Sequence, residues 1–522
     1  MAVSRVACRA QEGLTAPAVE VEVHLGAGLP SFTIVGLPAT EVKESKERVR
    51  AALVNSGYEF PAGRITVNLA PADLPKDGGR FDLAIAIGIL LAAGQLSIDS
   101  HRNAPRVEIL ELLGELGLDG EVRAVRGALP AAVAAHTAGH ALILPAANLD
   151  DLRFMPEVRA YGARSLREVC GHLTGVEKIS AAEFAGLAPR VAATDERSPT
   201  LEDLCGQAEG KRALEVAAAG GHGLLLVGPP GCGKSMLAQR LPGLLPPLHA
   251  DEALEVAMIA SVALRPGAIA GTQIERPFRA PHHTASAGAI IGGGPRSLPG
   301  EITLAHRGVL FLDELPEFER RVLEALREPL ESGTISLARV GGRAEYPAGF
   351  QLIAAMNPCP CGHAGDATRR CRCKSVEVAR YRRRLSGPLL DRIDLRVVLA
   401  AVSDADLAAH RARTSTADRQ LQQTRCVRIL AARERQWRRQ GCLNATLDGP
   451  TLEQHASLEP AAQKLLLRAR ALRGLSMRGL QRCLRVARTL ADLEAKNAIG
   501  DVNVAESLRL RSALEEHASE RV

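Results

Sequence analysis

The fold of this chain is decided by the stretch Gly228-Pro229-Pro230-Gly231-Cys232-Gly233-Lys234-Ser235. It fits the pattern G-x-x-x-x-G-K-[ST], and it lies between an apolar strand over 224–227 and a helix that begins at Lys234. Glycines in that context let consecutive backbone N–H groups turn inward, and the helix N-terminus adds partial positive charge. The stretch therefore predicts a phosphate-binding loop, in which Lys234 reaches the β- and γ-phosphates of ATP and Ser235 holds Mg²⁺.

A second motif reads Gly308-Val-Leu-Phe-Leu-Asp313-Glu314. Four apolar residues in a row predict a buried parallel strand, and α/β sheets bind ligands at the carboxyl ends of such strands. Asp313 is expected to hold Mg²⁺ through water, and Glu314 is expected to polarise the attacking water. The predicted chemistry is therefore hydrolysis and not binding alone. The alternative is that Asp313 only caps a helix expected over 316–330.

Three further polar side chains are candidates for the same site. A strand over 350–356 ends at Asn357, whose amide can orient the water or the γ-phosphate. Arg392 ends a helix, and a cation there can enter the site of a neighbouring subunit and stabilise charge on the transferring phosphoryl group. Arg478 is placed to supply a second arginine within its own subunit. For both arginines an ordinary surface charge is the alternative.

Composition and periodicity predict the domain organisation. The 522 residues are 46% hydrophobic and 24% charged, as in globular proteins, and they are too many for one ordinary domain. We expect an α+β domain over 1–175, a linker over 176–200, an α/β core over 201–401 and a helical lid over 402–522. No apolar run can span a bilayer, no signal peptide is evident, and most cysteines are scattered. A cytoplasmic location without a membrane partner is expected.

The order of these motifs resembles the magnesium-chelatase-like branch of AAA+ ATPases. The likeness is carried by Asp203-Leu-Cys-Gly-Gln-Ala-Glu-Gly-Lys, the phosphate loop, Asp313-Glu314, Asn357 and Leu389-Leu-Asp-Arg-Ile-Asp. With the domain in front, nearly the whole chain is similar to the family of the bacterial competence protein ComM, also called YifB. The resemblance implies a homo-hexameric ring that uses ATP and Mg²⁺ to move along DNA. In that family the motor drives branch migration in homologous recombination during natural transformation, alongside recombination proteins.

The resemblance also assigns roles to the residues named above. They are Lys234 and Ser235 in Walker A, Asp313 and Glu314 in Walker B, Asn357 as sensor 1, Arg392 as the arginine finger and Arg478 as sensor 2.

The domain over 1–175 resembles the proteolytic domain of Lon proteases, a fold also found in a small-subunit ribosomal protein. The stretch 75–82 places Arg80 where Lon has its nucleophilic serine, and the position of the general-base lysine falls on Leu129. A Ser–Lys dyad needs a hydroxyl to attack and an amine to accept its proton, and both are replaced here. A binding or assembly role is therefore expected for this domain.

Two insertions in the core carry cations where the chelatase-like and replicative-helicase branches line a central pore. Their candidate DNA contacts are Arg279, His282, His283 and Arg296 in the first insertion, and Arg339 and Arg343 beside a predicted hairpin turn in the second. Phosphate contacts by Arg and His are independent of base sequence and suit a translocase. Solvated or subunit-contacting loops are the alternative. An arginine run over 425–439 is interpreted as a solvated helical face, with DNA loading as a second reading.

Four cysteines form a C-x-C…C-x-C set directly after Asn357. They are Cys359, Cys361, Cys371 and Cys373. Four thiolates in so short a loop can close a tetrahedral Zn²⁺ site, which would stabilise a segment with little core of its own. Reduced loop cysteines or a redox pair are the alternative.

The leading functional hypothesis is a DNA-translocating ATPase. One alternative is the ATPase motor subunit of a metal chelatase, which would use the same ring to drive metal insertion into a tetrapyrrole. Another is a non-proteolytic assembly scaffold. The Lon-like domain and the cysteine loop favour the first hypothesis, because chelatase motors need neither.

Overall fold

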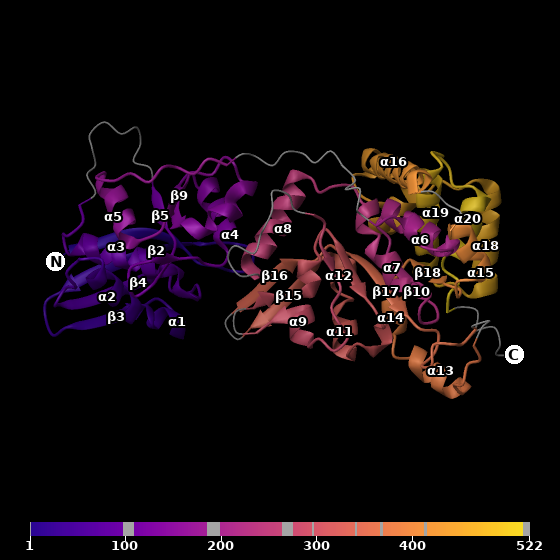
Figure 1. Ribbon diagram of the computed structural model, residues 1–522, viewed down its shortest axis with the longest axis horizontal. Helices are drawn as coiled ribbons and strands as arrows, with labels where there is room; N and C mark the ends of the chain where they lie inside the picture. Colours follow the sequence, from indigo (N-terminus) through magenta and orange to yellow (C-terminus); the bar gives the residue numbers. More distant parts are fainter. Residues whose placement is uncertain are drawn as a thin grey trace.

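The computed structural model describes residues 2–97, 109–184, 199–263, 275–294, 297–339, 342–365, 369–411 and 415–514. Figure 1 shows three units arranged along the long axis of the molecule: a mixed-sheet unit at the N-terminus, an α/β unit in the middle and a helical unit at the C-terminal end. Within the described ranges, no helix is both long and apolar enough to cross a membrane.

The N-terminal unit is built on a seven-stranded sheet of order β3-β4-β2-β1-β5-β8-β9. Its elements are β1 (Ala2–Arg9), β2 (Ala18–Gly26), β3 (Ser31–Val35), α1 (Thr40–Lys43), α2 (Ser45–Asn55), β4 (Arg64–Ala70), α3 (Asp82–Ala92), β5 (Leu110–Leu112), β6 (Glu115–Leu116), β7 (Val122–Arg123), α4 (Ala128–Thr137), β8 (Ala141–Pro145), β9 (Ala160–Ala163) and α5 (Leu166–Thr174). Strand β2 buries Val19, Val21 and Val23 between exposed or half-buried residues. This alternation turns one face of the sheet toward the core and leaves the other to solvent.

The two positions that correspond to the Lon dyad lie inside the N-terminal unit. Arg80 is buried and donates to the backbone oxygen of Arg126 at 2.6 Å. Burial lowers the pKa of the Arg80 side chain to about 10. Leu129 is fully buried in α4. Arg80 therefore pairs with a backbone carbonyl, and Leu129 packs in the core of this unit. The Lon-like assignment stays a prediction.

The middle unit contains a five-stranded parallel sheet of order β11-β14-β17-β10-β18. These strands are β10 (Leu224–Val227), β11 (Phe278–Arg279), β14 (Val309–Leu312), β17 (Gln351–Met356) and β18 (Leu395–Val398). β10, β14 and β17 are buried along their whole length, and separate apolar clusters cover the two faces of the sheet. Near-continuous apolar strands are what a parallel sheet buried on both faces requires, so the predicted α/β core is confirmed.

Short helices and hairpins surround this sheet. They are α6 (Ala208–Gly220), α7 (Lys234–Gln239), α8 (Ala250–Ala263), α9 (Ala287–Ile291), β12 (Gly292–Gly293), β13 (Leu298–Pro299), α10 (Glu301–Leu304), α11 (Arg320–Ala325), α12 (Pro329–Ser332), β15 (Thr334–Arg339), β16 (Gly342–Pro347), α13 (Ser375–Arg382) and α14 (Gly387–Leu390). The single helix expected over 316–330 was wrong, because α11 and α12 are separate. Pro329 lacks an N–H and cannot donate a hydrogen bond to the carbonyl of Ala325, where α11 ends, which accounts for the break.

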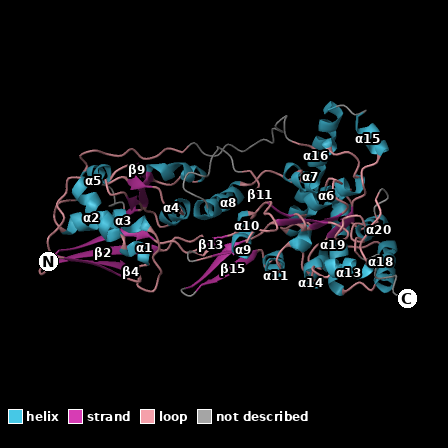
Figure 2. Ribbon diagram, turned by 60° about the horizontal axis from the view of Figure 1, so that its bottom comes forward, coloured by secondary structure: helices cyan, strands magenta, loops and turns pink. Residues whose placement is uncertain are grey.

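The C-terminal unit is helical. Its helices are α15 (Asp404–Arg411), α16 (Ser415–Gln440), α17 (Gly449–His455), α18 (Pro460–Arg473), α19 (Met477–Leu493) and α20 (Asp501–Arg509). Helix α19 buries Cys483, Val486, Ala487 and Leu490, which recur every three or four residues along one face. Figure 2 shows α16 and α19 on either side of α6, which both of them contact.

Helix α8 joins the N-terminal unit to the core. Its Ser261 accepts from the backbone N–H of Gly127 at 2.8 Å, and its Ala257 belongs to the apolar cluster of the N-terminal unit. On the core side, Glu255 binds Arg307 at 2.7 Å, and Glu252 binds Arg276 at 3.2 Å. The helix therefore contacts both the N-terminal sheet unit and the segments that flank β11 and β14.

Candidate nucleotide site

Three neighbouring strands end at one edge of the core sheet. The loop 228–233 follows β10, Asp313 follows β14 and Asn357 follows β17. Since parallel strands present their carboxyl ends at the same edge, the side chains after them meet. The Ser235 hydroxyl donates to Asp313 Oδ2 at 2.6 Å, and Lys234 Nζ donates to Asn357 Oδ1 at 3.1 Å. The structure thus brings together the residues assigned to Walker A, Walker B and sensor 1.

The phosphate loop depends on glycine at defined positions. Gly233, which directly precedes α7, has a φ of 92°, a left-handed conformation that favours glycine. A Cβ at Gly228 would lie 2.8 Å from the backbone oxygen of Leu399 at the end of β18. These constraints fix the loop between the sheet and the first turn of α7, where backbone N–H groups lack intrahelical partners.

Lys234 is the cation of this loop. Its Nζ donates to the backbone oxygens of Gly228 and Pro229, at 2.8 and 2.9 Å, as well as to Asn357. Burial lowers the pKa of Lys234, while the neighbouring Cys232, Asp313 and Glu314 oppose that shift. A phosphate oxygen that replaced one of these acceptors would compensate the buried charge, which is the chemistry expected of a lysine in this position.

Asp313 and Ser235 supply the oxygen ligands that suit Mg²⁺. A carboxylate oxygen and a hydroxyl oxygen 2.6 Å apart form a hard donor set beside the loop. The second Asp313 oxygen accepts from the backbone N–H of Glu314 at 2.9 Å, which fixes the orientation of the carboxylate. Together these two side chains can hold a Mg²⁺ ion that arrives with a nucleotide, directly or through water.

Glu314 has an unusual backbone and an unexpected partner. Its φ is 53°, in the left-handed region that non-glycine residues seldom adopt, and its side chain is 50% exposed. Its Oε2 lies 3.1 Å from His283 Nδ1, and the His283 ring stacks on His282 with ring centroids 4.2 Å apart. Sequence reasoning missed the contact between Glu314 and His283. The local sequence carries no signal for this contact, because it depends on β11 and β14 being neighbours in the sheet.

The other candidate DNA contacts are placed differently. Arg279 forms a two-bond fork with Glu301 of α10, at 2.6 and 2.7 Å, and these bonds raise the pKa of its guanidinium. Arg339 and Arg343 lie in the paired strands β15 and β16, but their side chains fall outside the described residues, as does Arg296 altogether. A role in DNA binding stays a prediction for all of them.

The two candidate catalytic arginines, Arg392 and Arg478, both act on the carboxylate of Glu331. Arg392 is only 7% exposed, and its Nη2 lies 2.5 Å from Glu331 Oε1. The hydrogen bond from Arg392, helped by the charges of Arg478 and Arg482, lowers the pKa of Glu331. Among the described contacts, neither Arg392 nor Arg478 bonds to the phosphate loop of its own chain. Their catalytic roles stay predictions.

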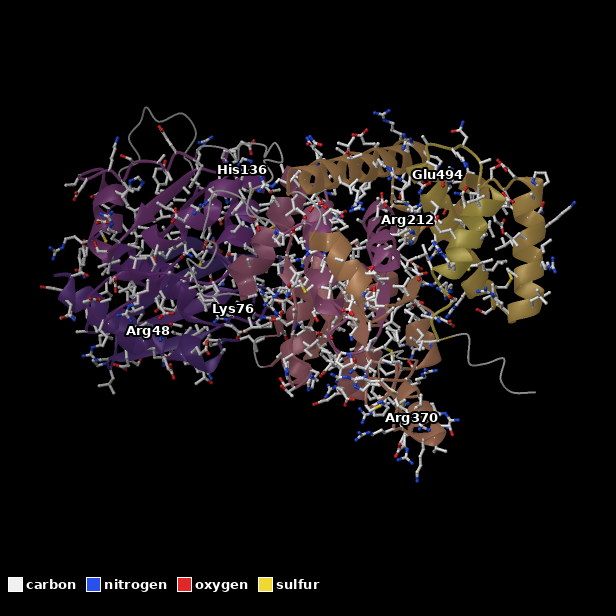
Figure 3. The ribbon with its side chains drawn as sticks, turned by 45° about the vertical axis from the view of Figure 1, so that its right-hand side comes forward. Arg48, Lys76, His136, Arg212, Arg370 and Glu494 are labelled. Carbon is white, nitrogen blue, oxygen red and sulfur yellow. The ribbon has the colours of Figure 1, made fainter. Side chains whose placement is uncertain are left out.

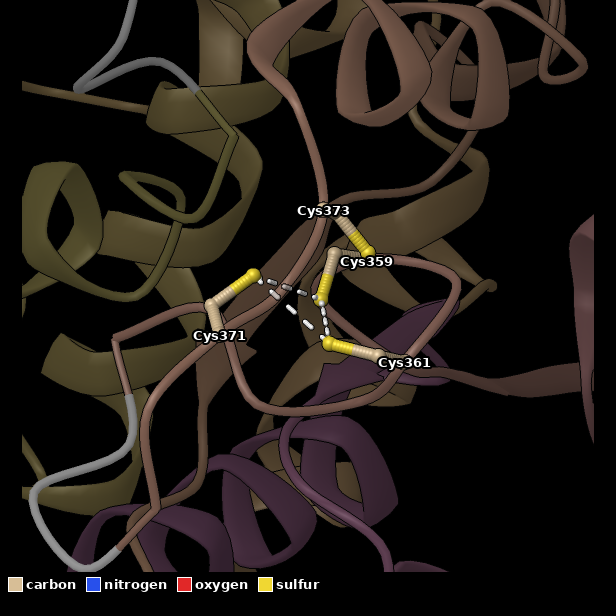
Figure 4. Close-up of side chains that lie close together, drawn as sticks. All are labelled: Cys359, Cys361, Cys371 and Cys373. Atoms are coloured by element: carbon tan, nitrogen blue, oxygen red, sulfur yellow. Dashed lines mark hydrogen bonds between the residues drawn. The ribbon is translucent and has the colours of Figure 1, made fainter.

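The four loop cysteines converge (Figure 4). Their sulfur atoms all lie within 4.8 Å of one another, and the three closest pairs are 3.4 to 3.6 Å apart. Tetrahedral Zn–S bonds of about 2.3 Å place sulfur atoms about 3.8 Å apart, so the spacing fits zinc. The backbone N–H groups of Arg372 and His363 lower the pKa of Cys361 to about 6, whereas burial and the neighbouring cysteines outweigh a backbone hydrogen bond and raise the pKa of Cys371 and Cys373.

The cysteine loop touches the phosphate loop. Gly362 has a φ of 84°, and a Cβ there would lie 2.7 Å from Pro230 Cδ and 3.9 Å from Asn357 Cγ. The loop also begins two residues after Asn357. A metal that ordered the four cysteines would therefore order a surface that packs directly on the nucleotide site.

Comparisons with known proteins agree with this geometry. A family model described as magnesium chelatase, subunit ChlI, matches residues 200–407, and models for subunit ChlI of Mg-chelatase and for its C-terminal part match residues 21–148 and 420–511. The uncharacterized protein YifB of Salmonella typhimurium is 46% identical over 98% of this chain and 97% of its own length. Competence protein ComM of Haemophilus influenzae is 44% identical over 98% of both chains. The magnesium-chelatase 38 kDa subunit of Acidiphilium rubrum is 28% identical over 30% of this chain and 51% of its own.

Proposed function

Because this chain belongs to the ComM/YifB family of magnesium-chelatase-like AAA+ ATPases, we propose that it hydrolyses ATP to move along DNA and drive branch migration in homologous recombination during natural transformation. The observation that carries the hydrolysis step is the meeting of Lys234, Ser235, Asp313 and Asn357 at one sheet edge. ATP and Mg²⁺ are the expected ligands there. Glu314 is the residue best placed to polarise the attacking water.

A homo-hexameric ring is the assembly that this proposal requires. Arg392 would stabilise charge on the γ-phosphate in the site of the neighbouring subunit, and Arg478 would act within its own subunit. In the single chain Arg392 is held by Glu331, whose side chain is half exposed. When the ring forms, Arg392 would leave Glu331 and bind the γ-phosphate of the nucleotide in the neighbouring subunit. Until then, Glu331 would hold the Arg392 side chain in place.

His283 offers a route from DNA to hydrolysis. It lies in the first core insertion, which is expected to face the pore, and it bonds to Glu314. A DNA phosphate that drew His283 away would release the Glu314 carboxylate to polarise water. DNA is therefore proposed both as the track of the motor and as its activator.

The first prediction concerns the coupling of ATP hydrolysis to DNA. Duplex or four-way-junction DNA should raise the ATPase rate at low salt, and the stimulation should fade as salt rises because phosphate contacts are screened. His283→Ala should raise the rate without DNA about threefold and reduce the stimulation. Partly exposed ion pairs are worth about 0.2–1 kcal/mol, which corresponds to a few-fold change in rate.

The matched control is His282→Ala, because His282 stacks on His283 but bonds to Thr284 and not to Glu314. This variant should keep the basal rate of the wild type. A wild-type rate that DNA leaves unchanged at low salt would overturn the proposal of a DNA motor. Hydrolysis that instead responds to a tetrapyrrole and its metal would favour the chelatase alternative.

The second prediction concerns the cysteine loop, which we expect to hold one Zn²⁺ per chain. Cys371→Ser combined with Cys373→Ser should remove the metal and weaken nucleotide binding several-fold, because the loop packs on Pro230. Atomic emission spectroscopy and binding of a fluorescent ATP analogue measure the two effects. Cys205→Ser, which changes a cysteine outside the cluster, should retain both zinc and affinity. Folded wild-type protein with far less than one zinc per chain would contradict the predicted zinc site.

A further inference from the structure

The stretch 369–384, here called the basic arm, carries a larger net positive charge than the chain as a whole. Its sixteen residues include eight arginines and lysines and a single acid, Glu377. The whole chain has a formal net charge of +6, so without the basic arm it would carry −1. So strong a local concentration of one sign attracts a polyanion.

The cations of the basic arm face solvent. Figure 3 shows Arg370 at the tip of a part of the core that stands out from the body of the molecule, and Figure 1 shows α13 in the same position. Its exposed cations are Arg384, which pairs with Glu317, and Arg369, Arg370, Arg372, Lys374, Arg380 and Arg383. None of these last six forms an ion pair with a carboxylate in the described part of the chain. Glu377 instead accepts from the backbone N–H of Lys374 at 2.9 Å.

The second arginine-rich run of the chain behaves differently, which makes the basic arm distinctive. In α16, Arg425 pairs with Glu202, Arg428 lies 3.3 Å from Glu215, and Arg439 binds Asp492 at 2.6 Å. The first two pairs hold α16 to the core, and the third holds α16 to α19 within the helical unit. A count of charges along the sequence does not separate the two runs, but the pairing of their side chains does.

We propose that the basic arm binds the phosphate backbone of duplex DNA and thereby provides a second contact outside the pore. Single-strand binding surfaces stack bases on exposed aromatic rings, whereas the one aromatic residue of the basic arm, Tyr381, is buried. Exposed arginines and lysines bind phosphate oxygens whatever the base sequence, so the basic arm suits the backbone of a duplex. The inference rests on the proposed function, because the basic arm would hold the duplex that enters or leaves the motor.

The basic arm is connected to the nucleotide site at its base. Arg382 donates to the backbone oxygen of Pro358, at 3.3 and 3.4 Å, directly after Asn357. A hollow of about 510 Å³ between α11 and α13 is lined by Arg380, Arg383 and Arg384, and by Glu317, which pairs with Arg384. DNA held by the basic arm therefore lies against the segments that follow sensor 1 and Walker B.

The test uses the full-length protein and a fluorescent 20-base-pair duplex, with anisotropy measured between about 50 and 200 mM salt. Arg370→Gln, Arg380→Gln and Arg383→Gln together should lower duplex affinity about tenfold. The slope of log K against log salt should shrink by about 0.9 for each phosphate contact that is lost. The matched control neutralises three exposed cations of α18, Lys464→Gln, Arg468→Gln and Arg470→Gln, and should stay within twofold of the wild type.

The outcomes separate this inference from the function on which it rests. If the wild type binds the duplex and the triple variant matches it in affinity and slope, the basic arm is not a DNA surface. If the triple variant and the α18 control lose DNA affinity equally, the loss reflects only the net charge of the protein, and the inference is also overturned. Binding of poly-L-glutamate as tight as that of DNA would reassign the surface to acidic proteins. A wild type that binds no DNA at all would overturn both proposals. If the triple variant fails to fold, Arg370→Glu alone carries the test, with an expected loss of about threefold.

Discussion

Glu314→Gln is expected to bind ATP with wild-type affinity and to hydrolyse it at least about 10²-fold more slowly. A positioned general base contributes about 10²–10⁴-fold to rate, and the substitution keeps the shape of the side chain while removing its basicity. The phosphate loop and the Ser235–Asp313 pair do not involve the Glu314 carboxylate, so nucleotide binding should survive. Steady-state hydrolysis and equilibrium binding of a fluorescent ATP analogue measure the two effects separately.

The control for this prediction is Glu319→Gln, an exposed carboxylate five residues further along the chain. It should hydrolyse ATP at the wild-type rate. Lys234→Ala should differ from Glu314→Gln in nucleotide binding. It removes the cation of the phosphate loop and should therefore abolish binding itself. Normal turnover by Glu314→Gln would show that another residue activates the water. We also expect Glu314→Gln to form rings that keep their ATP and do not unwind four-way junctions.

The nucleotide site could be predicted from the sequence because its signals are local. The phosphate loop, Asp313 and Asn357 each directly follow an apolar strand, and parallel strands put such positions at one edge. The convergence of the four cysteines was equally predictable, since their spacing leaves a short loop little freedom. In both cases chain geometry over a few residues determines which side chains meet.

Contacts between distant segments could not be predicted in this way. Nothing in the local sequence pairs His283 with Glu314 or Arg392 with Glu331, because each pair depends on strand order and helix packing. The broken helix over 316–330 was a different failure, in which apolar periodicity outweighed the signal of Pro329. The basic arm shows a third limit: its charges are evident in the sequence, but the fold decides that six of its exposed cations form no ion pair among the described residues.

One long-range arrangement of this kind determines how the helical unit is held to the sheet. His222, which precedes β10, places its Nδ1 2.9 Å from Asp394 Oδ2 and its Nε2 2.7 Å from the Thr489 hydroxyl of α19. Arg482 of α19 also binds Asp394, which precedes β18. Asp394 and His222 are both buried. A buried carboxylate thus connects two strands of the core with the central helix of the lid.

The charge of Asp394 is stabilised by these partners. Burial alone would raise the pKa of its carboxyl, but the charge of Arg482 and the bonds from His222 and Arg482 hold that pKa well below its usual range. A depressed folded-state pKa contributes stability above the unfolded pKa of about 3.9, and this contribution is lost as the pH falls through the folded value. The network should therefore be at full strength at neutral pH and fail only in strong acid.

Asp394→Ala is expected to destabilise the protein by about 3–5 kcal/mol at pH 7. The reason is that it leaves Arg482 and His222 facing a site from which their counter-charge has been removed, and an uncompensated buried charge costs about this much. Urea unfolding followed by the fluorescence of Trp437, the single tryptophan of the chain, reports on α16 of the lid. Asp391→Ala is the matched control, because that carboxylate is 45% exposed and lies 3.9 Å from Arg396, so its loss should cost less than about 1 kcal/mol.

The difference in unfolding free energy between wild type and Asp394→Ala should persist at pH 5 and shrink below about pH 4, because the folded-state pKa of Asp394 is lowered. Equal unfolding midpoints for the two variants would mean that apolar packing around α19, and not this ion pair, holds the lid on the sheet.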